Sequence, residues 1–294
     1  MKNLPLICLL FPLLICSCEE SKPSNEFKVI PISDKQEELK ASEFIADIQY
    51  IPLETDSVFL SDIKIMCPTR DDFFIFDGEQ IARFNKAGRF LNIVGKKGKG
   101  PQEFSYVKSF TVSEPTKTVW VAKPEGIVIY KYDGSFHQNI ILPAKKQVSS
   151  LQAYGDKMLC LQSNASGQSP VSWYCLDKDG NEVGSRPNHF RFNTVKWNWA
   201  FFKEHFFYTT GNNLYCKEMN SDTIFRVGGR NEPVFVLDQQ DRGFDIATRT
   251  RDYGHYWMKN SGKHYVFKGI LGTDKYLFLN FYYQGKYTTN VYRY

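Results

Sequence analysis

One short turn recurs along this chain at a constant interval. The turn Asn85-Lys-Ala-Gly88 returns as Tyr132-Asp-Gly134 and as Asp177-Lys-Asp-Gly180, so that its glycines lie 46 residues apart. Each turn follows a stretch of aromatic and β-branched residues, the types that pack well on a pleated sheet. A repeat of about 40 to 50 residues built from strands and tight turns is typical of a β-propeller blade. The sequence therefore predicts an all-β protein made of similar blades.

The strand-like stretches fall into groups of four, which is the strand number of a propeller blade. About five blades are visible, in the ranges 62–94, 107–142, 151–176, 206–237 and 264–294. A further strand-like stretch, Asp47–Leu53, precedes them. Because an open ring leaves unpaired strand edges, we expect this stretch to close the ring. It either completes the fifth blade or belongs to a sixth blade whose other strands are absent from the chain.

The composition agrees with one large all-β body. The chain has 294 residues, and 16% of them are aromatic, which suits half-buried sheet surfaces and a large core. Its formal net charge of +5 is too small to indicate nucleic-acid binding. We therefore expect no nucleic-acid partner.

The N-terminus has the features of a secretion signal. Lys2 supplies a positive charge, and the stretch Leu4–Ile15 is almost entirely apolar but too short to span a membrane. It leads into Ser17-Cys18, which resembles the bacterial lipoprotein signal, in which a small residue precedes a Cys that receives lipid after cleavage. The resemblance implies a signal peptide over residues 1–17 and a lipidated Cys18 that binds the membrane. An ordinary signal peptide cut nearby is the alternative.

The residues after Cys18 suggest the remaining boundaries. Residues 18–44 are expected to hold the lipidated Cys and a polar linker, and residues 45–294 to form the propeller. Glu19-Glu20 resembles an acidic signal that sends some lipoproteins to the outer cell surface. We therefore expect an outer-membrane-anchored lipoprotein of the bacterial cell envelope, facing either the periplasm or the cell surface.

Three motifs carry a resemblance that covers Ile45–Tyr294. They are Tyr50-Ile-Pro-Leu-Glu-Thr55, the pair Phe90–Gly95 and Gly98–Phe104, and the pair Asp222–Val227 and Pro233–Asp238. Together they resemble a family of bacterial six-bladed β-propeller lipoproteins, which are similar to propellers of NHL-repeat type. The most specific element is the turn Gly98–Phe104, in which Gln102 replaces a residue that is usually small in the family. The resemblance implies a six-bladed ring whose last blade is missing from this C-terminally short chain.

The remaining motifs indicate neither a metal nor a cofactor. Gly95–Gly100 is rich in glycine, but Pro101 follows it where a phosphate-binding loop needs Lys and then Ser or Thr. Asp177–Glu182 resembles a calcium loop but lacks its acidic twelfth residue. The five histidines are scattered singly, without the spacing of a zinc site. The cysteines outside the signal are expected to be small buried side chains, with a disulfide between Cys160 and Cys175 as the alternative.

Two segments are the candidate binding regions. The segment Phe190–Phe202 gathers aromatic rings beside cations, and rings with neighbouring cations can stack on sugars or hold a protein partner. The segment Asp238–Gly262 is a long charged connection of the kind that carries binding groups on a rigid scaffold. The candidate ligand-binding residues are Arg191, Trp197, Trp199, Arg242, Arg249 and Arg251. The alternatives are rings packed between blades for the first segment and a solvated loop for the second.

The predicted function is that of a membrane-anchored propeller that binds a ligand, a glycan or a protein, without catalytic activity. The first alternative is an NHL-like lyase or hydrolase that uses a metal or an acid pair in the central channel. Inner strands with converging Asp, Glu or His would favour an enzyme, but the predicted inner strands are mostly apolar or neutral. The second alternative is a truncated gene product with no function of its own.

Overall fold

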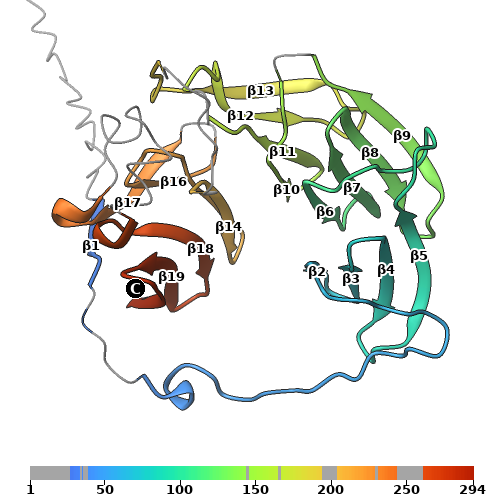
Figure 1. The fold of residues 1–294 in the computed structure, drawn as a ribbon, viewed down its shortest axis with the longest axis horizontal. Coiled ribbons are helices and arrows are strands. Elements are labelled where there is room, and N and C mark those ends of the chain that lie inside the picture. The colour runs from blue at the N-terminus through green and yellow to red at the C-terminus, as the bar shows by residue number, and fades with distance from the viewer. Residues whose placement is uncertain are drawn as a thin grey trace, which may run out of the picture.

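The computed structural model describes residues 27–33, 35, 39–143, 146–164, 167–193, 204–228, 231–243 and 261–294. Within these residues the protein is all-β, and its strands form five sheets. Figure 1 shows the sheets arranged around a common centre, as the blades of a propeller are. The fold class predicted from the repeated turn is therefore confirmed.

The first three blades each contain four antiparallel strands in chain order. Their strands are β2 (Ile65–Pro68), β3 (Asp72–Phe76), β4 (Gln80–Asn85), β5 (Phe90–Lys96), β6 (Ser109–Ser113), β7 (Thr118–Lys123), β8 (Gly126–Lys131), β9 (Phe136–Ile141), β10 (Ser150–Tyr154), β11 (Lys157–Leu161), β12 (Val171–Leu176) and β13 (Glu182–Pro187). The first strand of each blade lies nearest the centre and the fourth lies outermost (Figure 1). The repeated turn joins the third strand to the fourth in all three blades, which explains its constant interval.

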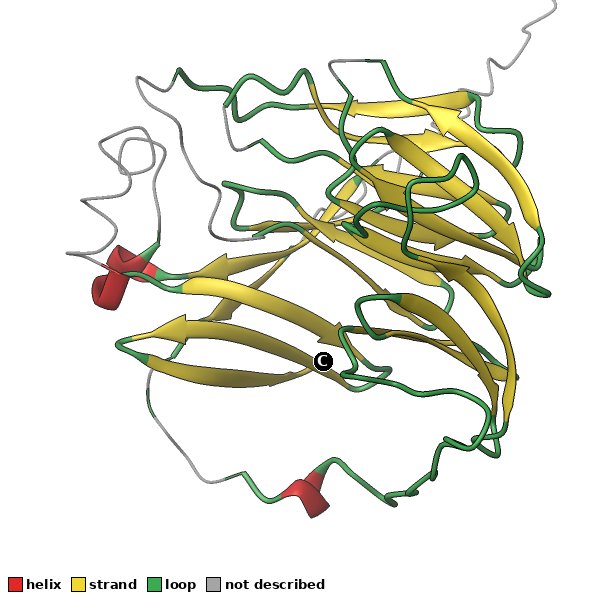
Figure 2. Cartoon of the chain, turned by 45° about the vertical axis from the view of Figure 1, so that its right-hand side comes forward, coloured by secondary structure: helices red, strands yellow, loops and turns green. Residues whose placement is uncertain are grey.

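The fourth and fifth blades differ from this plan in strand number. The fourth contains β14 (Phe206–Thr210), β15 (Asn213–Lys217), β16 (Thr223–Arg226) and β17 (Glu232–Asp238), and the N-terminal β1 (Lys28–Pro31) adds to β17 in parallel. The fifth contains β18 (Val266–Gly272), β19 (Tyr276–Tyr283) and β20 (Lys286–Arg293). Helical structure among the described residues is limited to the short 3₁₀ turns η1 (Ala41–Glu43), η2 (Gln240–Arg242) and η3 (Ser261–Lys263) (Figure 2). None of these residues forms a helix that is long and apolar enough to cross a membrane.

The N-terminal segment departs from the prediction in two ways. The expected linker contains β1, whose Ile30 is buried, and Ser33 joins β1 to the fifth blade through reciprocal hydrogen bonds with Asn290 of 2.9 and 3.0 Å. The expected strand Asp47–Leu53 is wrong, because these residues form no strand. They belong to a segment that runs between the β18–β20 sheet and the β2–β5 sheet (Figure 1). β1 escaped prediction because four residues are too few to show an alternating pattern.

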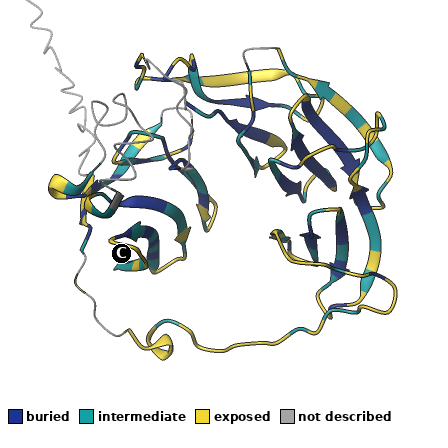
Figure 3. Ribbon diagram, viewed as in Figure 1, coloured by how far each residue is buried: buried dark blue, intermediate teal, exposed yellow. Residues whose placement is uncertain are grey.

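The hydrophobic core lies between neighbouring blades. One cluster joins the first two blades through Phe74, Phe104 and Val121, and another joins the second and third through Ile129 and Tyr174. Figure 3 shows the consequence, since the middle strands of the first three blades are the most deeply buried. Each blade therefore depends on its neighbours for burial of its apolar faces. This packing of the blades on one another holds the turns at both ends of the blades in fixed positions.

The repeated turns pack on the blade before them. Gly134 has a φ of +87°, and a Cβ atom added there would lie 2.3 Å from the carbonyl oxygen of Ile93 in β5. Gly180 has a φ of +86° and packs in the same way on the side chain of Ile140 in β9. Gly88 has a φ of +79°, and its neighbour is the carbonyl of Pro52. The segment around Pro52 thus contacts the first blade where an outermost strand would.

The four cysteines among the described residues, Cys67, Cys160, Cys175 and Cys216, are free thiols. Cys160 lies opposite Tyr174, whereas Cys175 lies opposite Leu159, so the two thiols belong to opposite faces of the third blade. Cys160 packs in the core toward the second blade, and Cys175 packs in the core toward the fourth. The disulfide that the sequence left open is therefore absent.

Candidate functional site

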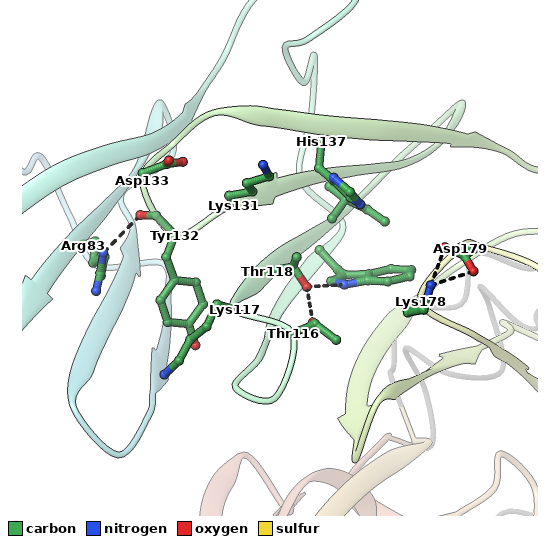
Figure 4. Close-up of a pocket in the computed structure, with 12 residues that line it drawn as sticks. Arg83, Thr116, Lys117, Thr118, Lys131, Tyr132, Asp133, His137, Lys178 and Asp179 are labelled. Atoms are coloured by element: carbon green, nitrogen blue, oxygen red, sulfur yellow. Dashed lines mark hydrogen bonds and ion pairs between the residues drawn. The ribbon is translucent and has the colours of Figure 1, made fainter.

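A pocket of about 540 Å³ lies where turns of three successive blades meet. The first blade contributes Arg83 from β4, and the third contributes Lys178 and Asp179 from the turn between β12 and β13. The second blade supplies the rest, from the hairpin between β6 and β7, the turn between β8 and β9, and the adjoining strands. Figure 4 shows Arg83 at one end and the Lys178–Asp179 turn at the other, with the second blade between them. We refer to it as the three-blade pocket.

Hydroxyl groups and an indole form one wall of the three-blade pocket. The Trp120 Nε1–H donates to Thr118 Oγ1 at 3.0 Å, and Thr118 Oγ1 lies 2.6 Å from Thr116 Oγ1. The indole is almost fully buried, so this hydrogen bond satisfies its polar atom and fixes the ring. His137 of β9 lines the same pocket. The wall therefore offers two hydroxyls and an imidazole to an incoming polar molecule.

Arg83 and Tyr132 form a rigid corner of the pocket. The Arg83 guanidinium donates twice to Asp72 Oδ2, at 2.8 and 3.0 Å, and once to the Tyr132 carbonyl at 3.3 Å. The guanidinium carbon of Arg83 also lies 5.0 Å from the centre of the Tyr132 ring. Lys117 Nζ lies 5.2 Å from the same ring centre. Burial raises the pKa of Tyr132, and the neighbouring carboxylates of Glu114 and Asp72 raise it further. The phenol therefore stays neutral at physiological pH.

The charges around the pocket leave cations in excess. Lys178 pairs with Asp179 at 2.9 Å, which raises the pKa of Lys178 and keeps it charged. Hydrogen bonds from Ser135 lower the pKa of Asp133, so that this carboxylate is also charged. Lys117 and Lys131 take part in no ion pair within the described part of the chain. The charge of Lys131 also lowers the pKa of Asp133, so Lys117 and Lys131 together exceed this carboxylate by one positive charge, and the pocket favours an anion.

Two predicted ligand-binding residues, Arg191 and Arg242, are among the described residues, and neither lines this pocket. Cys18, Trp197, Trp199, Arg249 and Arg251 lie outside the described residues. Arg191 is an exposed residue that follows β13. Arg242 packs on the fifth blade, where its Nη1 donates to the Tyr265 hydroxyl at 2.8 Å and its guanidinium lies 5.4 Å from the Tyr283 ring centre. The described contacts of Arg242 therefore attach its side chain to Tyr265 and Tyr283 of the same chain.

The repeat itself contains a signal for the three-blade pocket. Asp133 and Asp179 both stand one residue before a repeated glycine, and Lys178 stands two before it. Equivalent turns of successive blades lie at the same end of the propeller, so these charged residues had to be neighbours. The contributions of Arg83 and of the hairpin at Lys117 had no such signal, because they come from other positions of the repeat.

A second pocket, of about 400 Å³, lies among the inner strands. β2, β6, β10 and β14 contribute Met66, Thr111, Gln152 and Thr209 to it. Its lining includes one carboxylate, Glu114, and one thiol, Cys67, whose pKa is raised to about 12 by burial. Among the described residues, no group of three or more His, Cys, Asp or Glu side chains is arranged to hold a metal.

One Ser–His contact appears between the third and fourth blades. Ser149 Oγ lies 2.9 Å from His205 Nε2, and the same oxygen lies 2.9 Å from the Leu161 carbonyl, to which it donates. A hydroxyl has a single proton, so the imidazole must be the donor to Ser149. A nucleophilic serine requires the opposite arrangement, with its proton given to the histidine. The contact is therefore a structural link between the two blades.

The model of a protein family described as a domain of unknown function, DUF4934, matches residues 27–293. The chain belongs to the DUF4934 family. No curated protein sequence matches this DUF4934 chain.

One solved structure supports the fold of the DUF4934 chain. A protein of Bacteroides fragilis described as exported is 18% identical, with a TM-score of 0.69 over 90% of this chain and 77% of its own. At such low identity the likeness shows the propeller fold alone. The extracellular domain of a hybrid two-component system of Bacteroides thetaiotaomicron is 12% identical, with a TM-score of 0.49, and the match covers 82% of this chain and 28% of the other.

Proposed function

We propose that this protein is a binding protein of the bacterial cell envelope, which recognises an anionic ligand in the three-blade pocket. The observation that carries the proposal is the pair of lysines, Lys117 and Lys131, that face the pocket without ion-pair partners among the described residues. Rigid blades hold the surrounding groups in place, so little conformational freedom is lost when a ligand binds. The ligand class that fits is an acidic glycan.

The chemistry of the pocket supports an acidic glycan over a simple anion. Thr116, Thr118 and His137 offer hydrogen-bonding groups that match the hydroxyls of a sugar. Lys117 and Lys131 match a carboxylate or sulfate group. The volume of about 540 Å³ also exceeds that of an inorganic ion and falls within the usual range for small-ligand pockets.

The residues of the inner strands support a binding protein rather than an enzyme. The alternative, an NHL-like lyase or hydrolase, needs a metal or a pair of acids at the centre of the ring. Among the described residues that line the inner pocket, Glu114 supplies the one carboxylate, and the Cys67 thiol is protonated at neutral pH because burial raises its pKa. Neither group has a described partner for acid–base chemistry there.

An envelope location with a lipid anchor on Cys18 is part of the proposal. The sequence supports it through the apolar stretch Leu4–Ile15 followed by Ser17-Cys18. The Bacteroides fragilis protein of similar fold is itself described as exported. Whether the body faces the periplasm or the cell surface depends on the acidic pair Glu19-Glu20.

The glycan proposal predicts a loss of binding when the unpaired lysines are removed. We expect Lys117→Met combined with Lys131→Met to weaken binding of a galacturonic acid oligosaccharide about tenfold or more, because two attractive charges are lost. Isothermal titration calorimetry measures the affinity, with a neutral galactose oligosaccharide as the comparison ligand. The matched control is Lys157→Met with Lys275→Met, two exposed lysines away from the pocket. Equal losses in both double variants would show non-specific charge attraction and refute the proposal.

A further inference from the structure

A third pocket, of about 440 Å³, lies between the first and second blades at the end opposite the three-blade pocket. Its residues come from the approach to β2, the turn between β3 and β4, and the segment that leads into β6. Strand direction alternates within each blade, so these connections lie at one end and the turns of the three-blade pocket lie at the other. The two pockets are therefore separate sites.

The floor of this pocket is apolar. Phe76, Phe104 and Val107 belong to the core between the two blades, and their exposed fractions are 7%, 1% and 6%. The rings of Phe76 and Phe104 meet edge to face, with their centres 5.9 Å apart. Tyr106 stands at the rim with 63% of its surface exposed. A hydrophobic body can thus lie on a fixed aromatic floor beside a tyrosine that is free to cover it.

The turn that ends at Phe104 holds one wall of the pocket in place. Its Glu103 carboxylate accepts a hydrogen bond of 2.8 Å from the Gly100 amide, and Gly98 donates to the Phe104 carbonyl at 3.1 Å. The Tyr130 hydroxyl donates to the Gln102 carbonyl at 2.8 Å. These bonds fix the position of Phe104 before any ligand arrives, and the floor is preorganised.

The charges at the rim are all positive. Among the described residues, three lysines line the pocket and no carboxylate does. Lys64 pairs with Asp62, and Lys97 pairs with Glu79. Lys108 belongs to none of the ion pairs formed by the described residues, and it is half-buried beside the apolar floor. The pocket therefore has one cation in excess next to a hydrophobic surface.

We propose that this pocket binds a small amphipathic monoanion, a carboxylic acid with an aromatic or aliphatic body. The body lies on Phe104 and Val107, and the carboxylate accepts a hydrogen bond from the Lys108 ammonium. A charge-assisted hydrogen bond at a partly buried site contributes more than one at an open surface. The proposal is independent of glycan binding, because the two pockets share no residue.

The test compares a charged probe with its neutral counterpart. We expect the protein to bind biphenyl-4-carboxylate, and to bind biphenyl-4-carboxamide about tenfold more weakly, as measured by isothermal titration calorimetry. In Lys108→Met this preference for the carboxylate should disappear, while the weaker carboxamide affinity is kept. Tyr106→Ala should weaken both probes by a similar factor, since it removes apolar contact and no charge. A thermal melt confirms that each variant is folded.

Two controls separate this site from other causes. Lys157→Met removes an exposed lysine elsewhere and should leave both affinities unchanged. The double variant Lys117→Met with Lys131→Met should also leave them unchanged, whatever its effect on glycans. The proposal is overturned if biphenyl-4-carboxylate fails to bind at millimolar concentration. It is also overturned if Lys108→Met keeps the preference for the carboxylate.

Discussion

Replacing Cys18 with Ala in the full chain is expected to move the protein from the membrane fraction of a bacterial host to the soluble fraction. Each methylene of an acyl chain contributes about 0.8 kcal/mol to membrane binding, so a protein that carries several chains is held stably. Without the thiol no chain can be attached, and nearly all of the protein should leave the membrane. Fractionation followed by immunoblotting measures this change, and metabolic labelling with an alkyne fatty acid reports the lipid directly.

Cys16 is the matched control for this variant. It lies two residues earlier and follows Ile15, which is too bulky for the position before a lipidated cysteine. Cys16→Ala should therefore keep both the fatty-acid label and the membrane location. If the label is lost in Cys16→Ala and kept in Cys18→Ala, the anchor is misplaced. If neither variant changes location, the protein is held at the membrane by some other means.

The second large effect is expected at Gly134. Its φ of +87° is unfavourable for any residue with a Cβ, and the added atom would lie 2.3 Å from the Ile93 carbonyl oxygen. Left-handed strain costs about 1–2 kcal/mol. Overpacking against fixed neighbours costs about 1–3 kcal/mol. We therefore expect Gly134→Ala to lower the free energy of unfolding by about 3 kcal/mol, as measured by urea denaturation.

A substitution at Gly155 separates the cost of backbone strain from the cost of overpacking. It has a φ of +60°, and an added Cβ would have no atom within 4 Å. Gly155→Ala should therefore show the backbone strain alone, about 1 kcal/mol. Gly180→Ala should fall between the two, because its obstacle is the movable side chain of Ile140. Equal losses at all three positions would show that contact between blades contributes nothing to the cost.

The blades could be predicted because their signals are local. Aromatic and β-branched stretches separated by turns mark strands, and Gly88, Gly134 and Gly180 mark a repeat whatever the rest of the chain does. β1 and the path of residues 47–53 could not be predicted in this way. Four residues that pair in parallel with β17 depend on a partner about 200 residues away, and no local pattern records such a partner.

The three-blade pocket and the pocket beside Lys108 could not be predicted from local sequence patterns either. Arg83, Lys117 and Lys131 look like ordinary surface charges in the sequence, and Lys108 is one of many lysines. The excess of cations at each pocket appears only when the ion pairs are known, since Asp72 holds Arg83 and Glu79 holds Lys97. Those pairings follow from strand register and from the packing of blades on one another.

The sequence by itself therefore determined the all-β repeat, the strands of the blades and the turns that join them, because each depends on residues close together in the chain. It also predicts a secretion signal, because such a signal depends on a short stretch of consecutive residues. Only the tertiary structure decided where β1 pairs, which thiols stay apart, and which lysines remain without a counter-ion. These features depend on distances between residues far apart in the chain, and packing between blades sets those distances.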